Sequence, residues 1–85
     1  MGCKARGTVF LNVLKDGHDS MALFCRRGNE TQPSLVGVYT RSKVEDKRPN
    51  LVPGTPEVRE YTVEYRDQDQ SVGEVSDVCR MTNQP

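Results

Sequence analysis

The single histidine of the chain, His18, lies in the polar stretch KDGHDS, close in sequence to Asp16, Asp19 and Ser20. Serine, histidine and aspartate perform nucleophilic catalysis when the histidine reaches the serine hydroxyl and the carboxylate orients the histidine. Neighbours in one turn rarely reach that geometry, because the fold has to bring the three groups together from separate elements. We therefore interpret the stretch as a polar turn, and no residue is predicted to be catalytic.

A second polar group, Asp67, Asp69 and Ser71, alternates in the way that a calcium-binding loop begins. Such a loop also requires glycine at its sixth position and glutamate at its twelfth, where Val72 and Val78 stand. We expect a solvated turn here. Neither a metal ion nor a cofactor is predicted.

The three cysteines, Cys3, Cys25 and Cys79, contain no Cys-x-x-Cys pair of the kind that binds zinc or exchanges disulfides. In the sandwich inferred below, Cys25 and Cys79 lie two strand spacings apart, about 9 to 10 Å, which is beyond the reach of a disulfide. We expect three free thiols in a reducing, cytoplasmic setting. Cys79 and Met81 are expected to face the core beside Val75.

Paired guanidinium groups at Arg26 and Arg27 close an apolar run, where they can hold a carboxylate or a phosphate. With Tyr39, Arg41 and Tyr65 they make up the predicted interaction surface. Further basic residues follow at 43, 47 and 48, but acidic residues at 45 and 46 interrupt them, so a mixed-charge surface is expected. Twelve basic residues balance twelve acidic ones over the chain, and no nucleic-acid partner is predicted.

No stretch approaches the roughly 18 apolar residues of a membrane span, and the first residues lack the apolar core of a secretory signal. We expect no membrane partner and no export. The sequon Asn29-Glu30-Thr31 would then carry no glycan, because this signal has a meaning only in an exported protein.

Short apolar runs between turn residues indicate the elements that would position these groups. Strands are expected at residues 8–14, 20–27, 35–42, around Val44, at 58–66 and at 75–82. The Asp16-Gly17 pair predicts a hairpin between the first two, and residues 67–74 are expected to turn the chain into the last. About six strands at this spacing predict one antiparallel β-sandwich over residues 8–82, with a flexible segment 1–7 and a frayed end 83–85.

Alternation along these strands assigns side chains to faces. In the third strand, Leu35 and Tyr39 are expected on one face and Val36 and Val38 on the other. In the long strand at 58–66, three large side chains share a face and alternate with polar residues: Tyr61, Val63 and Tyr65.

The second half of the chain resembles a fibronectin type III domain. The resemblance rests on Leu51, Pro53, Gly54 and Thr55, on Tyr61 and Val63, and on VGEVSD at residues 72–77. It implies an immunoglobulin-like sandwich in which Leu51 packs at one end and the Tyr61 ring enters the core, with its hydroxyl bonded to backbone a few residues upstream. It also implies that Gly73 lies in a turn and that Ser76 starts the last strand.

That family has a strand before the one expected at residues 8–14, and only seven residues stand there. A sheet that lacks this strand keeps an open edge, and open edges invite another chain to pair with them. We therefore expect a homo-oligomer, a dimer formed by edge pairing or strand exchange. The strand at 20–27, apolar on both faces, is a second candidate contact.

These observations favour a non-catalytic module that acts through protein–protein contact, with itself or with another protein. The alternative is a small-ligand or carbohydrate-binding protein that uses surface tyrosines and arginines, which requires Tyr39 and Tyr65 to be exposed on one surface.

Overall fold

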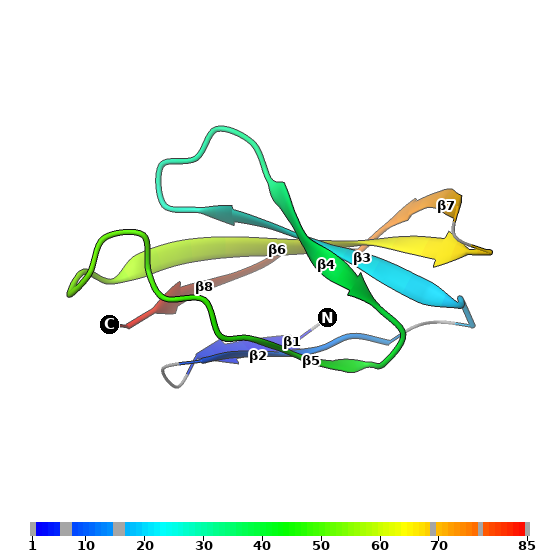
Figure 1. The fold of residues 1–85 in the computed structure, drawn as a ribbon, viewed down its shortest axis with the longest axis horizontal. Coiled ribbons are helices and arrows are strands. Elements are labelled where there is room, and N and C mark those ends of the chain that lie inside the picture. Colours follow the sequence, from blue (N-terminus) through cyan, green and yellow to red (C-terminus); the bar gives the residue numbers. More distant parts are fainter. Residues whose placement is uncertain (1, 6–7, 15–16, 69, 77, 85) are drawn as a thin grey trace.

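The computed structural model describes residues 2–5, 8–14, 17–68, 70–76 and 78–84. These residues form eight β-strands in two antiparallel sheets, so the predicted all-β, antiparallel sandwich is confirmed. In this part of the chain there is no helix long and apolar enough to cross a membrane. Figure 1 shows the smaller sheet lying below the larger one.

The smaller sheet has three strands in the order β1-β2-β5. They are β1 (Gly2–Ala5), β2 (Val9–Asn12) and β5 (Lys43–Asp46). The first two pair antiparallel, with Cys3 opposite Leu11, and β2 continues to β5 with Leu11 opposite Val44. The short edge strand expected around Val44 is therefore confirmed.

The larger sheet has the order β4-β3-β6, and both of the last strands lie along the far edge of β6. Its strands are β4 (Ser34–Tyr39), β3 (Ser20–Arg27), β6 (Glu57–Asp67), β7 (Gln70–Val75) and β8 (Cys79–Asn83). The end of β6 pairs with β7 and its beginning with β8. Between β7 and β8, Ser76 donates its backbone N–H to the Val63 carbonyl at 2.8 Å, and its hydroxyl accepts from the Val63 N–H at 2.9 Å. β7 and β8 thus act as one interrupted strand.

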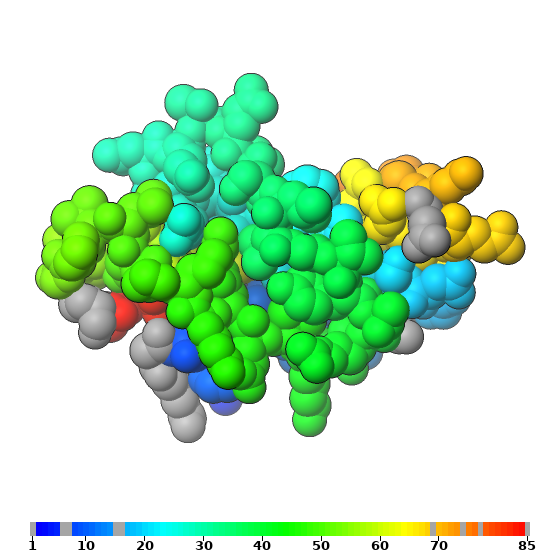
Figure 2. All heavy atoms as spheres, in the orientation of Figure 1, coloured from blue at the N-terminus to red at the C-terminus, as the bar shows by residue number. Residues whose placement is uncertain are grey.

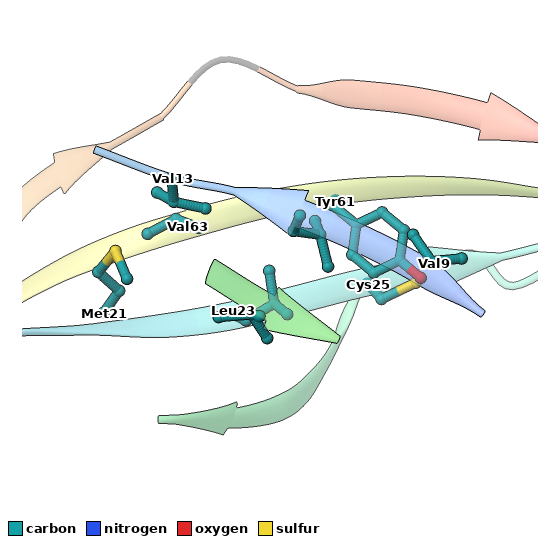
Figure 3. Packing of buried hydrophobic residues seen from close by; sticks show 9 residues of the cluster. Val9, Val13, Met21, Leu23, Cys25, Tyr61 and Val63 are labelled. Atoms are coloured by element: carbon teal, nitrogen blue, oxygen red, sulfur yellow. The ribbon is translucent and has the colours of Figure 1, made fainter. Parts of the chain in front are cut away.

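The core lies between the two sheets, where alternate side chains of facing strands meet (Figure 3). Its buried side chains come from β2 and the residue after it, from β5, from β3 and from β6: Val9, Leu11, Val13, Val44, Met21, Leu23, Cys25, Tyr61 and Val63. Burying one such large side chain stabilises the fold by about 1.5–3 kcal/mol. The sandwich is therefore held mainly by β2 packed against β3 and β6.

The predicted hairpin between residues 8–14 and 20–27 is wrong. Strands β2 and β3 belong to different sheets, so the chain between them crosses from one layer to the other. Gly17 in this crossing has a positive φ of 81°, while Asp16 lies outside the described residues. The crossing is favoured by burial of apolar surface. Side chains of β2 and β3 pack against one another across the core, which a hairpin within one sheet would not allow.

Both predicted termini also need correction. Residues 2–5, expected to be flexible, form β1, and residues 1, 6 and 7 lie outside the described part of the chain. Asn83, expected to fray, belongs to β8 and is 2% exposed. Most of the turn expected at 67–74 is strand β7. Because β1 pairs with β2, the edge of β2 that was expected to be open is covered, and β1 and β5 are the edge strands of the small sheet.

Candidate functional site

The five residues of the predicted interaction surface do not lie together. Arg26 and Arg27 end β3, whereas Tyr39 ends β4 and Tyr65 lies near the end of β6. β3 runs antiparallel to both neighbours, which places the arginines at one end of the sheet and the tyrosines at the other. Arg41 follows β4 and is exposed.

Both tyrosines turn toward the core. Tyr39 and Tyr65 each lie opposite the buried Met21, one on either side of it, and both pack against the core cluster. The Tyr65 hydroxyl donates to the Leu14 carbonyl at 3.0 Å. These side chains close one end of the sandwich and do not form an open aromatic platform.

The two arginines hold the turn that follows β3. Arg26 is ion-paired with Glu60, its Nε donating to Oε1 at 2.7 Å, and its Nη1 donates to the Glu30 carbonyl at 2.9 Å. The Arg27 guanidinium donates to the Pro49 carbonyl at 3.1 Å. Their donors are directed to groups of the chain itself, so they do not form a ready clasp for a free anion.

The outer face of the large sheet carries a different surface, which sequence reasoning missed. Its exposed large apolar side chains are Leu35 (56%), Val38 (52%) and Val75 (61%), with the half-buried Phe24 between them. Phe24 of β3 lies opposite Leu35 of β4. A second row across the sheet runs from β4 to β7 in the order Val38, Ala22, Glu64, Val75. We call Phe24, Leu35, Val38 and Val75 the outer apolar face.

A β-bulge in β4 creates this surface. Leu23 pairs with Gly37, and the next residue, Phe24, pairs with Leu35, so Val36 is an extra residue in the strand. The expected alternation, with Leu35 and Val38 on opposite faces, is therefore wrong, because the bulge brings both to the outer face. Val36 instead packs against the core.

Charged residues of both signs border the outer apolar face. At one end, Arg26, Glu60 and Arg80 form a row across β3, β6 and β8. Glu64 lies within the face itself, because it stands between Ala22 and Val75 in one row across the sheet. An apolar centre with a mixed-charge border is typical of a protein–protein contact surface.

Asp67 of β6 holds His18, a pairing that the KDGHDS stretch did not suggest. The His18 Nδ1 lies 2.9 Å from Asp67 Oδ2, and the Asp19 N–H donates to Asp67 Oδ1 at 2.9 Å. The hydrogen bond with His18 lowers the pKa of the Asp67 carboxyl below its usual value. The His18 ring lies 5.0 Å from that of Tyr65. These contacts hold residues 18 and 19, which lie between the two sheets, against the end of β6, and they support a structural role for this turn. Asp69, of the second polar group, lies outside the described residues.

A buried ionic cluster centred on Arg59 lies at the other end of the core. The Arg59 side chain is fully buried and donates to Glu57 Oε2 at 2.7 Å and to the Tyr61 hydroxyl oxygen at 3.2 Å. Its Nη1 lies 3.4 Å from Asp46 Oδ2, and Arg48 binds the same carboxylate through two contacts of 2.8 Å. The cluster links β5 to β6 across the sandwich.

The strand pattern contained a signal for this cluster. Glu57 and Arg59 continue, in steps of two, the inward series of Tyr61 and Val63. The Tyr61 ring is fully buried, but its hydroxyl donates to Asp46 Oδ2 at 2.7 Å. The expected bond from this hydroxyl to upstream backbone is therefore wrong, because a buried carboxylate takes that position.

Burial and charge pull the pKa values of this cluster in opposite directions. Burial alone would raise the pKa of the Asp46 carboxyl, but hydrogen bonds from Arg48 and Tyr61 lower it to about 2. Burial raises the pKa of the Tyr61 hydroxyl, so it remains a donor. Asp46 is thus a buried carboxylate, stabilised by the groups around it.

Two of the three expected free thiols form a disulfide. Cys3 of β1 and Cys79 of β8 are joined, with Cα atoms 6.4 Å apart, so the bond links an edge of one sheet to an edge of the other. The expectation was wrong because it left Cys3 in a flexible segment and tested only the pair Cys25 and Cys79. Cys25 is free and buried, as expected, and burial raises the pKa of its thiol.

The structural roles implied for residues 51–54 are only partly met. Leu51, expected to pack at the end of the sandwich, is 52% exposed, and its N–H donates to Glu57 Oε1 at 2.9 Å. Pro53 and Gly54 lie in an exposed turn, where Gly54 has a positive φ of 76°. Val63 is buried, as its alternation predicts.

Among the described residues, no group of three or more His, Cys, Asp or Glu side chains is arranged to hold a metal ion. Comparison of the chain with protein-family models, with curated proteins and with solved structures found no match.

Proposed function

We propose that this chain is a non-catalytic interaction module of fibronectin type III-like topology that associates with a second copy of itself through the outer apolar face. The strand order supports the topology, since β1-β2-β5 and β4-β3-β6 with β7/β8 follow the sheet partition of that family. Fold alone does not define function, so the proposal rests on the surface.

The observation that carries the proposal is the exposure of Leu35 and Val38 beside the half-buried Phe24 on the outer face of the large sheet, with the exposed Val75 beyond Glu64. Large apolar side chains that are exposed near one another on a small domain are costly to leave in water, and such patches mark contact surfaces. A second copy is the occupant favoured by charge. The chain has no net charge, which removes like-charge repulsion between copies and promotes association.

The contact differs from the one expected from sequence. β1 occupies the edge of β2 that was expected to be open, and the edge strands of the small sheet are β1 and β5. We place the contact on the outer apolar face because of its exposed apolar side chains. The small-ligand alternative has less support because Tyr39 and Tyr65 pack against the core. A cytoplasmic location was inferred from free thiols, and the Cys3–Cys79 bond removes that basis.

Light scattering coupled to size-exclusion chromatography tests the proposal. The wild-type chain is expected to show twice its 9.6 kDa mass at high concentration and to dissociate on dilution. Val38→Glu should abolish the dimer, because it buries an uncompensated charge in the contact. Phe10→Glu is the matched control: Phe10 is exposed (41%) on β2 of the other sheet, and charging it should leave the dimer intact.

A wild-type chain that remains monomeric at all concentrations would refute self-association. A dimer that survives Val38→Glu but is lost in Phe10→Glu would place the contact on the small sheet instead.

A further inference from the structure

Asn29 stands at the tip of the tight turn that follows β3. The Glu30 N–H donates to the Arg27 carbonyl at 3.0 Å, and Gly28 has a positive φ of 54°, which together define a β-turn with Asn29 at its third position. Asn29 and Thr31 are both exposed. The sequon Asn29-Glu30-Thr31 is therefore presented to solvent on a short, well-defined turn.

Hydrogen bonds from β3 and to β6 stabilise this turn. The Gly28 N–H donates to the Val58 carbonyl at 2.8 Å, and the Arg27 N–H donates to Glu30 Oε1 at 2.8 Å. Arg26 adds its bond to the Glu30 carbonyl. These contacts fix the residues on both sides of Asn29, which is itself exposed.

The disulfide changes what this sequon means. A sequon is informative only in an exported protein. Export is not expected from the first residues, which lack the apolar core of a secretory signal, so the case for it rests on the disulfide. The Cys3–Cys79 bond of the folded chain is of the kind that persists in oxidising compartments and is rare in the cytosol. The same chain thus combines a structural disulfide with an exposed acceptor sequence.

We propose that the chain is exported and that Asn29 is an N-glycosylation site. The donor class is an oligosaccharide linked to a polyprenyl diphosphate. The Asn29 amide nitrogen forms a bond to the anomeric carbon of the first sugar, the bond from that carbon to the diphosphate oxygen breaks, and the amide gives up one proton. The polyprenyl diphosphate leaves, and no oxidant or reductant is needed.

The surface beside Asn29 fits a sugar attached there. Asn29 lines a hollow of about 720 Å³ together with Leu51 and Val52, which are 52% and 61% exposed. Figure 2 shows residues 28–33 and 50–56 side by side at one end of the molecule. The apolar face of the first sugar would cover Leu51 and Val52, whose exposure the fold of the bare chain does not explain. The hollow adjoins the charged border of the outer apolar face through Arg26 and Arg80, but Phe24, Leu35, Val38 and Val75 do not line it. Glycosylation and self-association are therefore tested with variants at different residues, Thr31 and Val38.

The test begins with the protein from its own cells, in which occupancy reflects its natural compartment. Treatment with peptide-N-glycosidase should lower its mass and produce the Asn29→Asp change that this enzyme leaves at an occupied asparagine, read by tandem mass spectrometry. An unmodified Asn29, or Cys3 and Cys79 recovered as free thiols, would overturn the proposal.

Matched variants then assign the modification to this sequon. The full chain is expressed in a eukaryotic secretory pathway as wild type, as Thr31→Ala and as Thr31→Ser. The wild type and Thr31→Ser should carry the glycan, and Thr31→Ala should not, although Asn29 is present in all three. A glycan retained in Thr31→Ala, or absent from the folded and secreted wild type, would contradict the assignment.

Discussion

Replacing Asp46 by asparagine removes the charge of the buried cluster while keeping its shape. The surrounding groups lower the pKa of this carboxyl from 3.8 to about 2. At 1.36 kcal/mol per pKa unit, the ionised form stabilises the fold by about 2 kcal/mol relative to a neutral group. Breaking a buried ion pair costs about 3–5 kcal/mol in general. Because Glu57 still neutralises Arg59, we expect Asp46→Asn to lower the free energy of unfolding by about 3 kcal/mol at pH 7.

The effect should depend on pH in a defined direction. A carboxyl whose folded pKa lies below its unfolded value contributes its full stabilisation above about pH 4 and loses it as the pH falls through about 2. The wild type should therefore lose stability between pH 4 and pH 2, and the asparagine variant should lose less. The gap of about 3 kcal/mol at pH 7 should narrow to about 1 kcal/mol at pH 2.

Urea unfolding followed by circular dichroism, at a series of pH values and with the disulfide intact, measures both quantities. Glu45→Gln is the control, because Glu45 neighbours Asp46 on β5 but is exposed and lies 3.5 Å from Lys47. It should change the free energy of unfolding by less than about 0.5 kcal/mol. An asparagine variant as stable as the wild type at pH 7, or a gap of the same size at pH 7 and pH 2, would refute the reasoning.

Two further predictions concern the cysteines. Reducing the Cys3–Cys79 bond, or replacing both residues by serine, opens a covalent loop with a sequence separation of 76. It should lower the free energy of unfolding by about 4.5 kcal/mol on the chain-entropy model. Equal stability in the presence and absence of reductant would contradict this. Cys25 should react with a thiol reagent at pH 8 only as fast as the chain unfolds, because burial both shields its thiol and raises its pKa. Rapid labelling under native conditions would show that the residue is accessible.

The fold class could be predicted from the sequence because its signals are local. Turn residues recur between short apolar runs, and alternation with polar residues places Tyr61 and Val63 on one face, which is buried. Pairing is not local. The Asp16-Gly17 pair is typical of a hairpin. Whether the chain turns back within one sheet or passes to the other sheet depends instead on how β2 and β3 bury their apolar faces. Strand β1 was missed because GCKA has no strand pattern of its own, and its order comes from pairing with β2 and the bond to Cys79.

The candidate surface was harder to predict than the core. The outer apolar face depends on one extra residue in β4, Val36. Valine is common in regular strands, so its presence does not indicate a bulge. Arg26, Tyr39 and Tyr65 were chosen for the chemistry of their side chains, but the fold uses those side chains to hold a turn and to close the core. The type of a residue suggests what its side chain can do, whereas the pairing register of its strand determines whether that side chain is exposed to a partner.

The covalent link between β1 and β8 also determines how the domain would respond if it were pulled from its two ends. Strands at the two ends of the described chain are joined through Cys3 and Cys79, so tension entering from one side and leaving by the other passes through a covalent bond. The segment between these two residues, including the whole core, would be shielded from extension while the bond remains. In a series of such domains under mechanical load, each would therefore extend little while its disulfide is intact. Reduction of the disulfide would allow the residues between Cys3 and Cys79 to extend.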